Sequence, residues 1–170
     1  MAGKLKVYVE TSFVCYLTGD QTLDAKIAAD QAYTRQWWRD ERPSCEVVAS
    51  RFVLAEASVG KPEAVSRRLE ILKGVEFVGG DDDAIESLAR QLIEGHALPE
   101  KETTDALHIA IAAMSGVDVL LTWNCRHMAN PHTLPKTKEI LSRAGYICPQ
   151  VMTPKTFLDN RGLEEDGHES

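Results

Sequence analysis

Short apolar runs alternate along the chain with longer stretches whose apolar residues recur at helical spacing. The short runs predict four strands and a candidate fifth strand, at residues 6–9, 45–49, 75–78, 117–122 and 147–152. The longer stretches predict helices at residues 12–17, 22–40, 52–59, 62–74, 81–95, 103–114 and 135–144. Strands that alternate with helices are typical of a parallel sheet covered on both faces. We therefore expect an α/β fold, a three-layer α/β/α sandwich around a mainly parallel sheet of four to five strands.

No linker, repeat or low-complexity segment divides the 170 residues, so we predict one domain over residues 1–158. The remaining residues, 159–170, carry five acids and one arginine and are expected to form a flexible acidic tail. The whole chain has a formal net charge of −7, of which this tail contributes −4. The net charge excludes a broad basic surface for binding nucleic acid. Any contact with nucleic acid must therefore use local basic patches or a metal ion.

The chain has no apolar run of the roughly 18 residues that a membrane span needs, and its first residues lack the apolar core of a signal peptide. We therefore expect a cytoplasmic protein without a membrane partner. The cysteines, at positions 15, 45, 125 and 148, are far apart and form no Cys-x-x-Cys pair, so free thiols are expected rather than disulfides.

Polar residues follow two of the predicted strands at the point where each strand ends. Glu10-Thr11-Ser12 follows the first strand, and Thr122-Trp123-Asn124 closes the fourth. Sites in open parallel sheets form in the crevice beyond the carboxyl ends of the strands. The alternative is that these residues are solvated turns that cap the next helix, as Ser and Thr often do.

Two further carboxylates stand on helices with few polar neighbours. Glu56 lies in the helix of residues 52–59, and Asp105 opens the nearly all-apolar helix of residues 103–114. Each has an ordinary alternative: an exposed position for Glu56, and a first-turn acid for Asp105. One arrangement explains these acids and the two strand ends together, a convergence at one edge of the sheet that holds a divalent cation. Hard ions such as Mg²⁺ take few carboxylates and several waters, and leave room for phosphate oxygens.

Four short motifs stand at these places in a consistent order along the chain. They are Glu10-Thr11-Ser12, Glu56 in Leu-Ala-Glu-Ala, Asp105 in Asp-Ala-Leu-His-Ile-Ala, and Leu-Thr-Trp-Asn after the fourth predicted strand. Together they resemble the PIN domain, most closely the bacterial VapC-like toxins and their stand-alone relatives. The resemblance covers residues 7–158 and implies a metal-dependent endoribonuclease that hydrolyses RNA phosphodiester bonds with Mg²⁺ or Mn²⁺. It also raises the role of toxin in a toxin–antitoxin pair, with a small antitoxin protein as partner.

The resemblance assigns roles by position to six residues. They are three metal-binding and catalytic acids, an amide where the family usually has its fourth acid, and two supporting hydroxyls: Glu10, Glu56 and Asp105; Asn124; Ser12 and Thr122. Glu10 replaces the usual Asp, so its longer side chain must fold back to reach the same ion. Asn124 keeps a carbonyl oxygen that can ligate the ion or orient water, but it carries no charge. The alternative function is therefore a catalytically weakened PIN-like module that binds RNA or a protein partner without cutting.

Other chemistry-bearing side chains show weaker patterns. Cys125, His127 and His132 lack the second close ligand pair of a zinc site, which favours a polar loop. His108, one turn after Asp105, is interpreted as a packed or hydrogen-bonded core histidine rather than as a base.

The resemblance also implies a homodimer. The adjacent Trp37 and Trp38 favour packing at the core and its edge. The alternative for one of them is a place in the subunit interface, where tryptophan is favoured.

Overall fold

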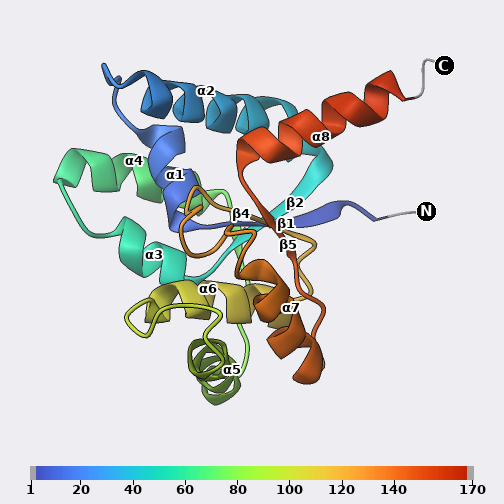
Figure 1. Cartoon of the computed structure of the whole chain (residues 1–170). Coiled ribbons are helices and arrows are strands. Elements are labelled where there is room, and N and C mark those ends of the chain that lie inside the picture. Colours follow the sequence, from blue (N-terminus) through green and yellow to red (C-terminus); the bar gives the residue numbers. More distant parts are fainter. Residues whose placement is uncertain (1–2, 168–170) are drawn as a thin grey trace.

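The computed structural model describes residues 3–167. Its centre is one five-stranded sheet in the order β3-β2-β1-β4-β5, in which every neighbouring pair is parallel (Figure 1). The strands are β1 Leu5–Val9, β2 Cys45–Ala49, β3 Glu76–Phe77, β4 Val119–Leu121 and β5 Gln150–Met152. The predicted α/β fold is confirmed, and the candidate fifth strand is part of its sheet.

Helices cover both faces of the sheet. The helices are α1 Thr11–Thr18, α2 Ala25–Asp40, α3 Arg51–Ala57, α4 Pro62–Lys73, α5 Asp82–Glu94, α6 Thr103–Met114, α7 Leu134–Arg143 and α8 Pro154–Asp166, with a short 3-10 turn at Arg42–Ser44. Figure 1 shows α1, α2 and α8 on one side of the sheet and α5, α6 and α7 on the other. Helices α3 and α4 pack beside α1. The layers are those of an α/β/α sandwich.

The core lies along the two central strands and helix α6. The β1 residues Val7, Tyr8 and Val9 are fully buried, because helices cover both faces of the strand. Helix α6 is apolar on nearly all sides and is correspondingly buried from Asp105 to Ala113, except at Leu107. The predicted continuous burial of this helix is therefore confirmed.

Trp37 is completely buried inside the chain. Its ring makes edge contacts with Phe13 and Phe157, at centroid distances of 5.5 and 5.7 Å. The alternative of an interface position is therefore wrong for Trp37, since its surface is already covered within one subunit. Trp38 is only partly buried and packs against Phe13.

The expected tail is helical over much of its length. Helix α8 continues to Asp166, whereas the composition predicts a flexible segment from residue 159 onward, and residues 168–170 lie outside the described range. Thr153 begins the helix by accepting a hydrogen bond from the backbone N–H of Thr156, and Phe157 buries its side chain against α2. This cap and the packing of Phe157 thus help to order a segment that the acidic composition alone predicts to be solvated.

Two further expectations from the sequence can be compared with the fold. Within residues 3–167, no helix is both long and apolar enough to cross a membrane. All four cysteines are free, as predicted.

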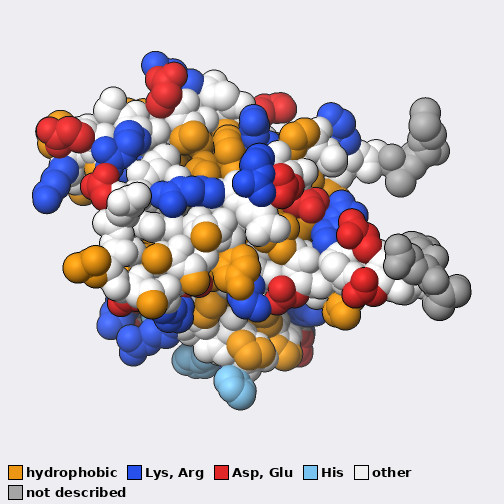
Figure 2. All heavy atoms as spheres, turned by 90° about the horizontal axis from the view of Figure 1, so that it is seen from above, with side chains coloured by type: hydrophobic (Ala, Val, Ile, Leu, Met, Phe, Trp, Pro, Cys, Tyr) orange, Lys and Arg blue, Asp and Glu red, His pale blue; other side chains and the backbone are white. Residues whose placement is uncertain are grey.

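The surface carries charges of both signs. Figure 2 shows lysine and arginine side chains interspersed with acidic ones on the face that it displays, with apolar side chains scattered between them. That face therefore has no continuous basic surface, in line with the expectation from the net charge of −7.

Candidate active site

Glu10 is held at the junction between β1 and α1. It is the N-cap of α1, and its Oε2 accepts hydrogen bonds from the backbone N–H of Ser12 at 3.0 Å and from the hydroxyls of Ser12 and Thr122, the latter at 2.8 Å. Only 5% of the residue is exposed. The longer side chain therefore folds back over the helix N-terminus, where the helix dipole stabilises its charge.

Glu56 reaches the same place from α3. Its Oε1 lies 2.5 Å from Nε2 of His108 and accepts a hydrogen bond from the Thr11 hydroxyl at 2.7 Å. Burial alone would raise the pKa of this carboxyl, but the hydrogen bonds from His108 and Thr11 outweigh it and lower the pKa below its usual value. Glu56 is therefore an anion near neutral pH.

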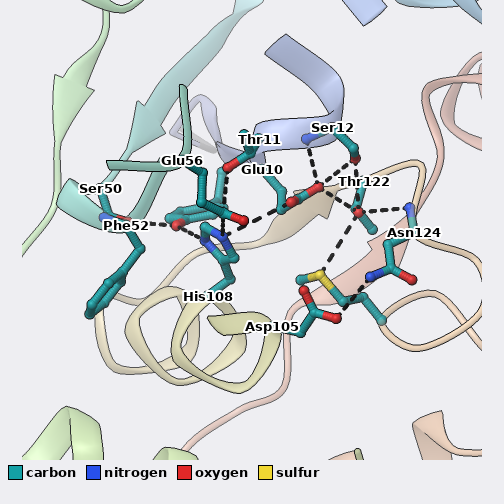
Figure 3. Close-up of polar contacts among 12 residues, drawn as sticks. Glu10, Thr11, Ser12, Ser50, Phe52, Glu56, Asp105, His108, Thr122 and Asn124 are labelled. Carbon is teal, nitrogen blue, oxygen red and sulfur yellow. Dashed lines mark hydrogen bonds and ion pairs between the residues drawn. The ribbon is translucent and has the colours of Figure 1, made fainter. Parts of the chain in front are cut away.

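A buried chain of hydrogen bonds supports the Nδ1 side of the His108 ring. Its Nδ1 lies 2.7 Å from the Tyr8 hydroxyl, which lies 2.7 Å from the Ser50 hydroxyl (Figure 3). Burial raises the pKa of Tyr8, so the phenol keeps its proton. Because Glu56 is ionised, the proton between it and His108 belongs to Nε2. His108 thus donates to Glu56, and its ring is held in place by Tyr8.

Asp105 and Asn124 form a second pair. The Asn124 side-chain N–H donates to Oδ2 of Asp105 at 2.9 Å, and Oδ1 of Asn124 accepts from the backbone N–H of His127 at 3.0 Å. Burial and the negative charges of Glu10 and Glu102 raise the pKa of Asp105 to about 6. The hydrogen bond from Asn124 only partly offsets this shift.

Thr122 connects the two groups. Its hydroxyl donates to Glu10 at 2.8 Å and accepts the backbone N–H of Asn124 at 3.0 Å. The Ser12 hydroxyl adds a second link, since it accepts the backbone N–H of Trp123 at 2.8 Å. The two polar strand ends therefore meet, as the parallel arrangement of β1 and β4 predicts.

Each of the three acids retains one oxygen that accepts no hydrogen bond within residues 3–167: Oε1 of Glu10, Oε2 of Glu56 and Oδ1 of Asp105. Carboxylate oxygens left without donors are the ligands that Mg²⁺ and Mn²⁺ take. The chemistry of these three oxygens therefore suits a divalent cation. Within the described part of the chain, Glu10, Glu56 and His108 form a group of three possible metal ligands, with one atom of each within 4.8 Å of the others.

No protein-family model and no curated protein sequence matches the chain. Among solved structures, the crystal structure of VapC20 from Mycobacterium tuberculosis, a Sarcin-Ricin loop cleaving toxin, superposes with a TM-score of 0.54. The match is 22% identical in sequence and covers 74% of this chain and 95% of that chain. The chain has a VapC-like PIN fold.

In this PIN fold the four residues predicted to bind the metal lie in two groups. Glu10 and Glu56 lie together with His108, whereas Asp105 faces Asn124 (Figure 3). His108 was correctly interpreted as a buried, hydrogen-bonded histidine, but the interpretation did not place it against Glu56. Its position three residues after Asp105 puts it on the same side of α6, but nothing in the sequence indicates its contact with Glu56 on α3.

Other residues considered from the sequence lie outside this cluster. In residues 3–167, Cys125, His127 and His132 are not brought together as a group of three possible ligands.

Proposed function

We propose that this protein is a divalent-metal-dependent endoribonuclease that hydrolyses RNA phosphodiester bonds as the toxin of a toxin–antitoxin pair. The observation that carries the proposal is the set of three acids at the carboxyl edge of the sheet, each with one oxygen free of hydrogen bonds within residues 3–167. The PIN fold supports it, because VapC20, which shares that fold, is a Sarcin-Ricin loop cleaving toxin.

Mg²⁺ or Mn²⁺ would be held by Glu10, Glu56 and Asp105. Asn124 would assist through Oδ1, which has one lone pair left after accepting the N–H of His127. A cation bound here supplies a Lewis acid for a phosphate oxygen and lowers the pKa of a coordinated water. It also offsets the repulsion between RNA and a chain whose net charge is −7.

The protein's own residues set the geometry of that site. Ser12 and Thr122 fix the Glu10 carboxylate, so that its Oε1 is the oxygen left for the cation. His108 and Thr11 do the same for Glu56, whose Oε2 remains free. Such positioning of charged ligands before the reaction is a large part of electrostatic catalysis.

The antitoxin and the homodimer are further parts of the proposal. They rest on the likeness to the VapC toxins that the motifs and the fold carry. We also propose a cytoplasmic site of action, since the RNA of a toxin's own cell lies there.

The alternative function, a module that binds without cutting, is favoured by one observation. The Asn124 amide occupies an oxygen of Asp105 at 2.9 Å, and it brings no charge of its own to the site. A site with three carboxylates binds a cation less tightly than one with four, because the charge of the ligands sets the affinity.

A cleavage assay on mixed RNA separates these functions. We expect cleavage with Mn²⁺ or Mg²⁺, none with a chelator, and a loss of at least about 100-fold in Glu10→Gln. The matched control is Glu46→Gln, which makes the same change at an exposed position on β2 and is expected to leave cleavage unchanged. Cleavage that persists in chelator would contradict the metal-dependent mechanism, and RNA binding without any cleavage would favour the alternative.

A further inference from the structure

A pocket of about 700 Å³ lies next to the proposed cleavage site. One wall is the end of α5 with the segment that follows it, from Ile93 to Glu100, and the other is the segment from Arg126 to Thr133 before α7. Asp105 follows the first wall along the chain, and Asn124 precedes the second. Asp105 and Asn124 are joined by a hydrogen bond of 2.9 Å, and the second wall contacts this pair through the backbone N–H of His127, which donates to Oδ1 of Asn124.

The second wall is fixed to the site by hydrogen bonds. The backbone N–H of His127 donates to Oδ1 of Asn124 at 3.0 Å, and Nε2 of His127 lies 3.5 Å from Oε1 of Glu102, at the start of α6. The side chain of Asn130 donates to the backbone oxygen of Arg126 at 2.9 Å. These contacts hold the segment of Arg126 and His127 against Asn124 and Glu102.

The first wall holds an imidazole at a strained backbone position. His96 has a φ of 61°, and no other residue with a side chain has a positive φ in residues 3–167. This position follows the end of α5, where glycine is usually found because it adopts this conformation without strain. A histidine that lines the pocket at this energetic cost points to a use for its ring.

The chemistry of the walls fits a nucleotide. Ile93 and Pro99 supply apolar surface, and the rings of His96 and His127 are flat groups on which a base can stack. The guanidinium of Arg126 is exposed and has no ion-pair or hydrogen-bond partner among the described residues. Its charge is therefore free for a phosphate of the strand.

Two acids in the walls decide which part of the nucleotide enters. Glu94 and Glu100 repel a second phosphate inside the pocket, but each can accept hydrogen bonds from the amino groups of a base. The base, and not the phosphate, is thus the part that suits the interior, while Arg126 binds the backbone at the rim. A volume of about 700 Å³ is in the range of pockets that enclose small ligands.

We propose that this pocket binds the base of one nucleotide of single-stranded RNA beside the bond to be cut, with the adjoining phosphate on Arg126. The assignment rests on the proposed function, because the acid cluster identifies which phosphodiester is cut. It adds a specificity site, since the residues that contact the base determine which nucleotide stands next to that bond.

The test measures the affinity for fluorescently labelled single-stranded RNA by anisotropy, in chelator so that the strands stay intact. A series of strands lacks one base at a time along the sequence. With the unmodified protein, we expect removal of one particular base to weaken binding about tenfold, as for a stacked and hydrogen-bonded base. Removal of bases far from that position is expected to change little.

Three variants assign the effect to the pocket. Glu94→Trp and Thr133→Trp fill it from opposite walls, and each is expected to abolish the difference between the complete strand and the strand without that base. Arg126→Ala is expected to weaken all strands by the same factor and to reduce the slope of log affinity against log salt by about 0.7. The control is Arg90→Ala, which removes an exposed arginine of α5 that has no charged partner within residues 3–167, and we expect it to change neither quantity. Circular dichroism confirms that each variant is folded.

The outcomes separate this proposal from the nuclease itself. Affinity that depends on no single base, or a base dependence that survives in a folded Glu94→Trp or Thr133→Trp, overturns the pocket and leaves the cleavage site in place. If Glu94→Trp and Thr133→Trp abolish the base-dependent binding but the unmodified protein cuts no RNA with Mn²⁺, the pocket is supported and the proposed nuclease function is overturned. No measurable affinity for any strand, in chelator and also with Mn²⁺ in the cleavage-deficient Glu10→Gln, overturns the pocket.

Discussion

Nε2 of the buried His108 lies 2.5 Å from Oε1 of Glu56, so a histidine on α6 fixes an acid carried by α3. The contact leaves the other oxygen of Glu56 for a cation, and Tyr8 holds the imidazole from its opposite side. His108 therefore acts through Glu56, as a positioning residue. Hydrogen-bonding partners of metal ligands typically contribute about 10- to 100-fold to metal affinity.

Replacing His108 tests this relationship. We expect His108→Ala to lower Mn²⁺ affinity by about 10- to 100-fold, because Glu56 loses the donor that orients it. Tyr8→Phe, which keeps the imidazole but removes its support, is expected to show a smaller loss in the same direction. Calorimetric titration measures both, with the exposed His132→Ala as control. A His108→Ala variant that folds and binds Mn²⁺ as the unmodified protein does would show that Glu56 needs no such support.

The sequence predicted that the two polar strand ends meet, because that signal is local. Glu10 and Thr122 follow a strand directly, Ser12 and Asn124 come two residues after them, and the carboxyl ends of parallel neighbours must lie at one edge. The place of His108 could not be predicted in this way. Its role depends on contacts with Glu56 and Tyr8, from two other elements, and no pattern within α6 shows which of its sides faces them.

The helix boundaries likewise divide into those with a local signal in the sequence and those set by tertiary contacts. Helices with a clear cap or stop, such as α4 between Pro62 and Gly74, were predicted within a residue of their ends. Helix α8 was missed because its order comes from a tertiary contact, the packing of Phe157 on Trp37, and not from a repeating apolar stripe. The pocket beside Asn124 was also beyond the sequence, since its two walls are separate segments that meet only in the fold.

The second prediction concerns the cation. If the three acids share one ion, millimolar Mn²⁺ binds only the folded state and raises the melting temperature, by about 8 °C for an ion at roughly 100 times its dissociation constant. Asp105→Asn is expected to lose at least half of this rise, because it removes one ligand charge. Asp83→Asn makes the same change at an exposed position in the first turn of α5 and is expected to keep the full rise. Differential scanning fluorimetry measures all three, and equal rises in both variants would exclude Asp105 from the ion's ligands.

The third prediction follows from the raised pKa of Asp105, which is about 6. In the unfolded chain an aspartate has a pKa of about 3.9, so between these values the folded state binds the extra proton. The stability that this proton gives is complete below about pH 4 and is lost as the pH rises through about 6. In chelator, we expect the free energy of unfolding of the unmodified protein to fall by about 2 kcal/mol relative to Asp105→Asn over this interval.

Urea unfolding at pH 4, 5, 6 and 7 checks the dependence. The comparison with Asp105→Asn is needed because Glu56, whose pKa is lowered, contributes stability that is lost in the opposite direction, as the pH falls. Two parallel curves for the two proteins would contradict the shift. A saturating cation is expected to remove the difference in the unmodified protein, because the ion favours the ionised carboxylate.

The last prediction uses Asn124, whose side-chain N–H donates to Oδ2 of Asp105 at 2.9 Å. Asn124→Asp replaces that donor by a carboxylate, so two negative groups face each other at the same separation. Without metal, we expect the variant to be less stable by about 1–3 kcal/mol, because it loses a hydrogen bond to a charged group and gains a repulsion. The pKa of Asp105 is expected to rise further for the same reason, which urea unfolding over the same pH range detects.

A divalent cation is expected to have the opposite effect on the relative stability of Asn124→Asp. A fourth carboxylate tightens its binding, since ligand charge sets the affinity, so the Mn²⁺-induced rise in melting temperature should be larger in Asn124→Asp than in the unmodified protein. We expect RNA cleavage equal to or above that of the unmodified protein, measured under saturating Mn²⁺. A variant that binds the ion more tightly but cleaves less would show that the Asn124 amide has a role of its own in cleavage. That role would be to orient Asp105, because the amide N–H is the only donor that Asp105 has within residues 3–167, and a carboxylate at position 124 cannot supply it.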